Sequence, residues 1–114
     1  MSRSVKTTIY PVKDIAKAKA LYGTLLGTEP YADAPYYVGF RVADHDVGLD
    51  PNGHSQGMTA PISYVDVDDI TATLKALVDA GAVVQQEPRD VGGGLLIASV
   101  KDDDGNVTGL RQAA

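Results

Sequence analysis

The sequence contains no cysteine, and this absence removes several kinds of chemistry at once. Disulfide bonds, thiolate nucleophiles and zinc–thiolate sites all need a cysteine sulfur. Since a chain without disulfides suits a reducing compartment, we expect a cytoplasmic location. Histidine is scarce as well. His45 and His54 are the only two, and both fall in predicted loops. The sequence therefore offers no Cys–His or Ser–His–Asp arrangement for nucleophilic catalysis.

Long apolar runs and an excess of basic residues are also missing. No apolar stretch approaches the roughly 20 residues that a bilayer-spanning helix needs, and the first six residues lack the apolar core of a signal peptide. The net charge is −5 and the isoelectric point is about 4.7. Because a basic surface supplies most of the affinity for nucleic acid, we expect neither nucleic acid nor a membrane as a partner.

The apolar content of the chain is sufficient for one domain. Its 114 residues are 44% hydrophobic and 22% charged, as in ordinary soluble globular proteins. We expect residues 1–114 to form a single domain of two modules. The first module covers about residues 5–50 and the second about residues 61–112, with a polar, glycine-containing linker at 51–60.

The first module is predicted to contain one helix among its strands. The segment 5–12 is rich in Val, Ile, Thr and Tyr and is typical of a strand. Asp14 is placed to cap a helix, whose apolar residues recur at helical spacing until Gly27 ends it. After a short connection, two further strands are predicted at 36–42 and 46–49.

The second module repeats this order. A strand is predicted at 62–67, and either Asp68 or Asp69 caps a helix that Gly81 closes. Three more strands are predicted, at 83–86, 95–100 and 106–111. Because a helix must cover one sheet face to bury its apolar side, the other face of each sheet stays open. Two such sheets can curve around a shared pocket.

Short motifs in both modules resemble the vicinal oxygen chelate superfamily, which includes glyoxalase I, extradiol dioxygenases and bleomycin-resistance proteins. Val12-Lys13-Asp14, Leu21-Tyr22 and Leu25-Leu26-Gly27 resemble the first unit of that family. Asp90-Val91-Gly92-Gly93-Gly94, Ile97-Ala98 and Asp102-Asp103-Asp104-Gly105-Asn106 resemble the end of its second unit, although the usual Pro is Asp103 here. The resemblance covers essentially the whole chain. It implies an α+β fold of two βαβββ modules, a cup-shaped mixed sheet with the helices outside, and commonly a homodimer.

Alternation along the strands predicts which side chains face the cup. If Val12 and Val67 point under their helices, the opposite faces are largely apolar with a few polar groups, as in most small-molecule pockets. We expect these ligand-binding residues: Tyr37, Arg41, Asp50, Tyr64, Asp66, Ile97, Ser99 and Arg111. Asp50 and Arg111 hold nearly equivalent places in the two modules, and either form an ion pair or recognise the ligand.

The resemblance also locates the positions at which metal-dependent relatives carry their ligands. In this chain they are Thr7, Gly48, Ile62 and Gly109. Threonine offers one neutral oxygen and the other three offer none, whereas a divalent ion needs converging imidazoles or carboxylates. We therefore expect no cofactor. The one alternative is a weak Mg²⁺ site, in which Asp50, Asp66 and water molecules would supply the oxygen ligands.

Three functions stay open from the sequence. The first is a small-molecule binding protein of the glyoxalase/bleomycin-resistance type, which sequesters an aromatic or hydrophobic compound without a metal and without catalysis. The second is a metal-dependent or metal-free lyase, isomerase or dioxygenase of the same superfamily. The third is a dimeric interaction module with no ligand. Gly48 and Gly109 either mark a close backbone approach or widen the cup floor for a flat ligand.

Overall fold

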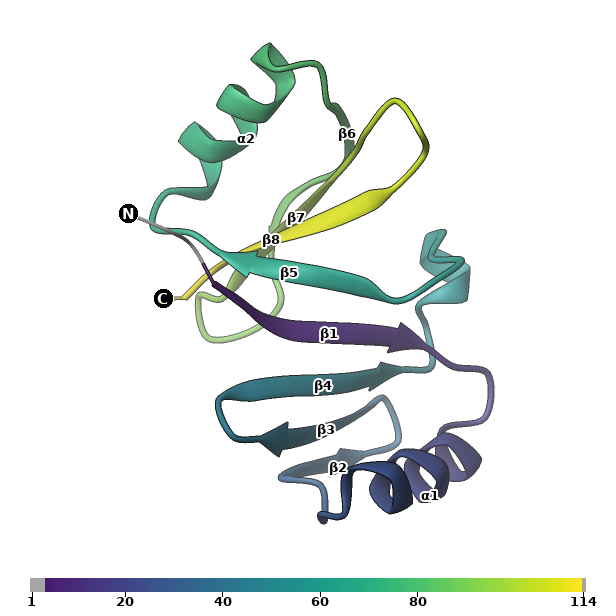
Figure 1. Cartoon of the computed structure of the whole chain (residues 1–114). Helices are drawn as coiled ribbons and strands as arrows, with labels where there is room; N and C mark the ends of the chain where they lie inside the picture. Colours follow the sequence, from purple (N-terminus) through teal and green to yellow (C-terminus); the bar gives the residue numbers. More distant parts are fainter. Residues whose placement is uncertain (1–3, 114) are drawn as a thin grey trace. The chain divides into compact units, whose positions relative to one another are not determined.

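The structure, a computed structural model, describes residues 4–113 and contains two modules with the same order of elements (Figure 1). Lys6–Ile62 form one compact unit, and the residues from Ser63 onward form the other, together with residues 4 and 5. Each module has one α-helix and four strands in the order βαβββ. The α+β class and the doubled βαβββ architecture are thus confirmed.

The first module contains β1 (Val5–Pro11), α1 (Ile15–Leu26), β2 (Ala32–Ala34), β3 (Tyr37–Val42) and β4 (His45–Asp50). Its strands lie in the order β2-β3-β4-β1. The β1–β4 pair is parallel, and the other two pairs are antiparallel. The short strand β2 has no counterpart among the predicted strands, because its Ala-Asp-Ala sequence has little strand propensity. Pairing with β3 holds it in place.

The second module contains β5 (Ile62–Asp66), α2 (Ile70–Asp79), β6 (Val83–Asp90), β7 (Leu96–Lys101) and β8 (Val107–Gln112). Its order, β5-β8-β7-β6, matches β1-β4-β3-β2 of the first module. Strand β6 is twice the predicted length, and its pairing with β7 is irregular between Val84 and Arg89. Pro88 lies in this stretch. A proline has no backbone N–H, and an outer strand tolerates it because the free side of such a strand needs no donor.

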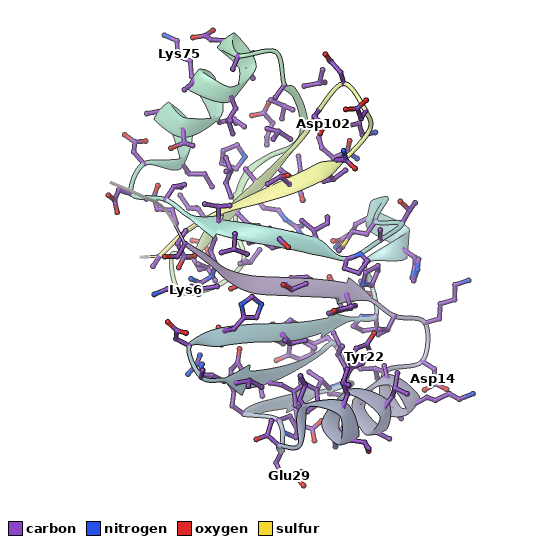
Figure 2. The ribbon with its side chains drawn as sticks, viewed as in Figure 1. Lys6, Asp14, Tyr22, Glu29, Lys75 and Asp102 are labelled. Atoms are coloured by element: carbon purple, nitrogen blue, oxygen red, sulfur yellow. The ribbon has the colours of Figure 1, made fainter. Side chains whose placement is uncertain are left out.

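Local signals set the helix ends. Asp14 lies at the start of α1 (Figure 2), where its Oδ1 accepts a hydrogen bond from the Lys17 backbone N–H at 3.1 Å. Asp69, rather than Asp68, caps α2 in the same way, through the N–H of Ala72 at 3.1 Å. Gly27 ends α1 with φ of 68°, a left-handed conformation that favours glycine. The linker contains one short 3₁₀ helix, η1 (His54–Gln56).

Each helix covers one face of the strands of its own module. Under α1 the core consists of Val38, Phe40 and Leu49, with Val12 and Tyr22 packed against it. Under α2 the buried residues are Val67, Ile70, Leu74, Ala98, Val100 and Leu110. Because side chains alternate along a strand, the residues between these core positions lie on the opposite side. We call that side, the one away from the helix, the open face of each module.

Candidate functional site

The open face of the first module is arranged in rows across three strands. One row contains Arg41, Asp46 and Thr7, and the next contains Gly39, Gly48 and Ile9. Two neighbouring glycines leave a shallow depression in a sheet, since they contribute no side chain. The rows therefore place charged groups beside a strip of bare backbone.

Two tyrosine rings fill that strip. A Cβ atom built on Gly48 would overlap the hydroxyl of Tyr37 and would lie 2.6 Å from Cδ1 of Ile9. One built on Gly39 would lie 2.9 Å from Cζ and Oη of Tyr31. Both distances are too short for a real side chain, so each ring requires the glycine beneath it. This aromatic cover of strand glycines is a known means of stabilising a sheet.

Arg41 connects the charged row with the aromatic strip. Its Nε lies 2.7 Å from Oδ1 of Asp46, and its guanidinium carbon lies 4.6 Å from the centroid of the Tyr31 ring. The hydrogen bond and the charge of Asp46 raise the pKa of Arg41 above its usual value. The guanidinium is thus an ion-pair partner and at the same time a cation over an electron-rich ring.

Tyr37 is held in its neutral form. Burial is the main cause of its raised pKa, followed by the charge of Tyr31, a side-chain hydrogen bond with Tyr31, and the charges of Asp46 and Asp50. Desolvation and nearby negative charge both disfavour the phenolate. At physiological pH the Tyr37 hydroxyl is therefore a hydrogen-bond donor and not an anion.

On the open face of the second module, a tyrosine ring again lies over a strand glycine. Tyr64, on β5, lies over Gly109, and a Cβ there would overlap the ring carbon Cδ1 and lie 2.5 Å from Cε1. Tyr64 and Ser99 are both buried. Beside them, Nη1 of Arg111 lies 3.3 Å from Oδ1 of Asp66. This face therefore also combines an aromatic ring, a glycine and a paired arginine.

The strand pattern places all eight expected residues on the open faces. Tyr37, Arg41 and Asp50 belong to the first module, and Tyr64, Asp66, Ile97, Ser99 and Arg111 to the second. Their role in binding a ligand stays a prediction.

The structure bears on three of the sequence-based interpretations. Arg111 pairs with Asp66, which lies opposite it in the parallel β5–β8 pair, so its ion-pair partner comes from its own module, and recognition of a ligand by Asp50 or Arg111 stays a prediction. The Asp50 carboxylate accepts a hydrogen bond from the Asn52 backbone N–H at 2.8 Å. The space above Gly48 and Gly109 is occupied by Tyr37 and Tyr64, so it does not widen the face for a ligand. His45, expected in a loop, begins β4, and its Nε2 lies 3.0 Å from Oγ1 of Thr8.

Sequence reasoning missed two members of the first module's open face. Asp46 lies two residues before Gly48 in the same predicted strand. Alternation along the strand therefore places it on the same face as Gly48 and Asp50, and the sequence could have predicted its position. Tyr31 precedes β2, in a segment with no recognisable strand pattern. Only the tertiary contact between its ring and Gly39 shows its place.

The residues at the family's metal positions do not fit a divalent ion. Thr7 is 7% exposed, and its Oγ1 has no hydrogen-bond partner among residues 4–113, but one neutral oxygen does not make a site. Gly48 and Gly109 lie under tyrosine rings, and Ile62 has no donor atom. Within the described part of the chain, no three His, Asp or Glu side chains gather in a way that could hold a metal ion.

The model of the Glyoxalase/Bleomycin resistance protein/Dioxygenase superfamily matches residues 4–110. The chain belongs to this superfamily. No curated protein matches the chain significantly. Among residues 4–113, neither helix has the length and apolar character to cross a membrane.

Several solved structures share the fold. A superfamily member from Vibrio splendidus 12B01 is 17% identical, with a TM-score of 0.73, and the match covers 98% of this chain and 100% of that one. The Mn(II)-bound glyoxalase from Novosphingobium aromaticivorans is 21% identical with a TM-score of 0.70, covering 98% of this chain and 40% of that longer chain. Methylmalonyl-CoA epimerase from Mycobacterium tuberculosis is 16% identical with a TM-score of 0.70, covering 96% and 87%. At these identities the likeness concerns the fold alone.

Proposed function

We propose that this superfamily member binds and sequesters a small aromatic or hydrophobic molecule on the open faces of its modules, without a metal. One observation carries the proposal: a tyrosine ring covers the glycine at two of the four metal positions, Gly48 and Gly109. The superfamily scaffold is retained while those positions hold aromatic surface in place of metal ligands. Capture of a ligand needs complementary surface and no catalytic group.

The chemistry of the open faces supports an uncharged, partly aromatic ligand. Tyrosine offers a large flat contact area with one polar atom. The arginines are already paired, Arg41 with Asp46 and Arg111 with Asp66, so the faces present few uncompensated charges. The proposed contacts are the eight residues expected from the sequence, together with Tyr31 and Asp46.

Catalysis is the alternative. The Novosphingobium aromaticivorans glyoxalase binds Mn(II), and the Mycobacterium tuberculosis protein is an epimerase. A metal-dependent activity in this chain would need donors that Thr7, Gly48, Ile62 and Gly109 do not supply. The residues therefore favour binding over metal-dependent chemistry.

We also propose a cytoplasmic homodimer. The outer strands β2 and β6 leave unpaired backbone groups at their free edges, and such edges are usually covered. Light scattering should give about twice the chain mass of 11.9 kDa. A mass close to that of one chain would refute the dimer and leave the binding proposal intact.

Thermal unfolding in the presence of aromatic compounds tests the binding proposal. A ligand at 100 times its Kd adds about 2.7 kcal/mol to the free energy of unfolding, which for a chain of this size raises Tm by about 10 °C. Naphthalene and indole derivatives are suitable first probes, because their flat rings can stack on the exposed ring of Tyr31. If no compound in a broad panel of aromatic and aliphatic molecules shifts Tm, the proposal is wrong.

A further inference from the structure

Helix α1 carries two leucines on its solvent-exposed side. Leu21 is 63% exposed and Leu25 is 72% exposed. Because they are four residues apart, they lie one above the other on the same ridge of the helix. A single exposed leucine is common on a protein surface. Two adjacent ones form an apolar patch that a second surface can cover, and we call them the leucine ridge.

The equivalent helix of the second module shows that the fold does not require such a ridge. Three residues of α2 are buried, whereas none is buried among residues 15–26 of α1. Among residues 70–79 of α2, Val78 is the one large hydrophobic side chain that is exposed, at 44%. The leucine ridge is therefore a feature of the α1 sequence and not of the βαβββ module.

The two ends of the leucine ridge carry opposite charges. Lys17 lies about one helical turn before Leu21, and Glu29 follows the C-terminus of α1, at the opposite end from Asp14 (Figure 2). Lys17 and Glu29 are both exposed, and in the described part of the chain neither forms an ion pair. The charges of Lys13 and Asp14 cancel, so the first end keeps one net positive charge and the second one negative charge.

We propose that the leucine ridge is the contact surface of a homodimer in which two α1 helices pack antiparallel. Around a twofold axis midway along the ridge, Leu21 lies beside Leu25 of the partner subunit, and Lys17 faces Glu29 of the partner subunit. Each contact occurs twice in such a symmetric interface. This inference rests on the homodimer proposed above and assigns its contact to α1 in place of a strand edge.

The charges favour a second copy of this chain, in this orientation, over other occupants. A ridge with an apolar centre and oppositely charged ends is its own complement once it is reversed, whereas a parallel pair would bring like charges together. The antiparallel order also places the positive end of each helix dipole near the negative end of the other. An anionic membrane would attract Lys17 but repel Glu29.

Sedimentation of the full chain over a dilution series measures the dissociation constant of the dimer. Leu25→Glu should raise this constant by about tenfold or more, because it places a carboxylate from each copy against apolar surface. Leu25 is exposed within one chain and glutamate favours helices, so the fold should be kept, as circular dichroism can verify. Val78→Glu, at the exposed valine of α2, is the matched control and should leave the constant unchanged.

Exchange of the two end charges tests the antiparallel arrangement. Lys17→Glu and Glu29→Lys should each weaken the dimer several-fold, because two attractive contacts become repulsive. The double variant Lys17→Glu/Glu29→Lys restores opposite charges and should recover the wild-type dissociation constant. A glutamate near the start of a helix and a lysine near its end both suit the helix dipole. A weaker dimer would therefore not reflect a weaker helix.

The outcomes separate the α1 contact from the homodimer itself. If the wild-type protein is a dimer and Leu25→Glu leaves its dissociation constant unchanged, the α1 contact is refuted and the dimer uses another surface. If Val78→Glu weakens the dimer as much as Leu25→Glu, the effect does not belong to the leucine ridge, which also refutes the contact.

If the double charge variant stays as weak as its two single variants, the antiparallel arrangement is refuted. If the wild-type chain is a monomer at every concentration, the homodimer and this inference fail together. Cosedimentation of such a monomer with phosphatidylserine vesicles would assign the leucine ridge to a membrane instead.

Discussion

The hydroxyl of Tyr37 occupies the space into which a side chain at position 48 would extend, so Tyr37 and Gly48 form a matched pair. The second module has a corresponding pair, Tyr64 and Gly109, built from a different strand. In both modules, an aromatic ring lies over a glycine at one of the positions that the family resemblance assigns to metal ligands. Substitution of either glycine by alanine tests whether the ring lies over it.

Gly48→Ala should destabilise the protein by about 1–3 kcal/mol, because the new methyl group overlaps the Tyr37 hydroxyl. Urea unfolding measures the change. Tyr37→Phe removes the overlapping oxygen and should recover part of the loss in the double variant. Gly23→Ala, in α1, is the control: its Cβ would be 3.6 Å from Phe40, and it should be neutral or stabilise by up to about 1 kcal/mol. Equal unfolding midpoints for Gly48→Ala and wild type would contradict the pairing.

Gly109→Ala should destabilise the protein at least as much as Gly48→Ala. The overlap here is with carbons of the Tyr64 ring, including Cγ at 2.7 Å, and a ring cannot turn away at its base. Tyr64→Phe retains those carbons, so it should give no recovery in the double variant. The same urea experiment decides the point. Recovery by Tyr64→Phe would show that the ring lies elsewhere.

The sequence predicts local features of this fold better than distant ones. Asp14, Gly27 and Asp69 act on backbone groups a few residues away, so their roles as helix caps could be predicted. Strand β2 forms because β3 supplies its hydrogen bonds, and Pro88 obscures the length of β6. These features depend on partners that local patterns do not show.

In the candidate site, too, the sequence predicts local features and misses those that depend on distant partners. Alternation along the strands predicts that Tyr37 and Gly48 share the open face, because it depends only on the backbone. It does not predict that the ring lies on the glycine, since that depends on the register between β3 and β4. For the same reason Tyr31, which precedes β2, could not be assigned to the site from its own segment.

Asp102 should make the β7–β8 turn sensitive to acid. It lies in this turn (Figure 2), where the side chain and backbone N–H of Asn106, and the backbone of Asp104, donate to its carboxylate and lower its pKa below 3.8. A lowered pKa contributes stability that is fully present above about pH 4 and is lost as the pH falls through the folded-state value. Asp102→Asn should therefore unfold at lower urea concentration at pH 7.

The difference between Asp102→Asn and wild type should shrink as the pH falls below 4. Asp103→Asn removes a neighbouring charge and leaves the Asp102 acceptor in place, so it serves as the control. A difference in unfolding free energy that stays constant from pH 7 to pH 3 would show that the Asp102 carboxylate does not stabilise the turn through its charge.

The central claim is that ligand capture needs no metal, and calorimetric titration before and after exhaustive treatment with a chelator tests it most directly. With 2-acetylnaphthalene as the probe, the account predicts saturable binding with the same Kd in both samples, unchanged when Mn²⁺, Ni²⁺ or Zn²⁺ is added back. Binding that disappears with the chelator and returns with one of these ions, together with stoichiometric uptake of that ion, would contradict it.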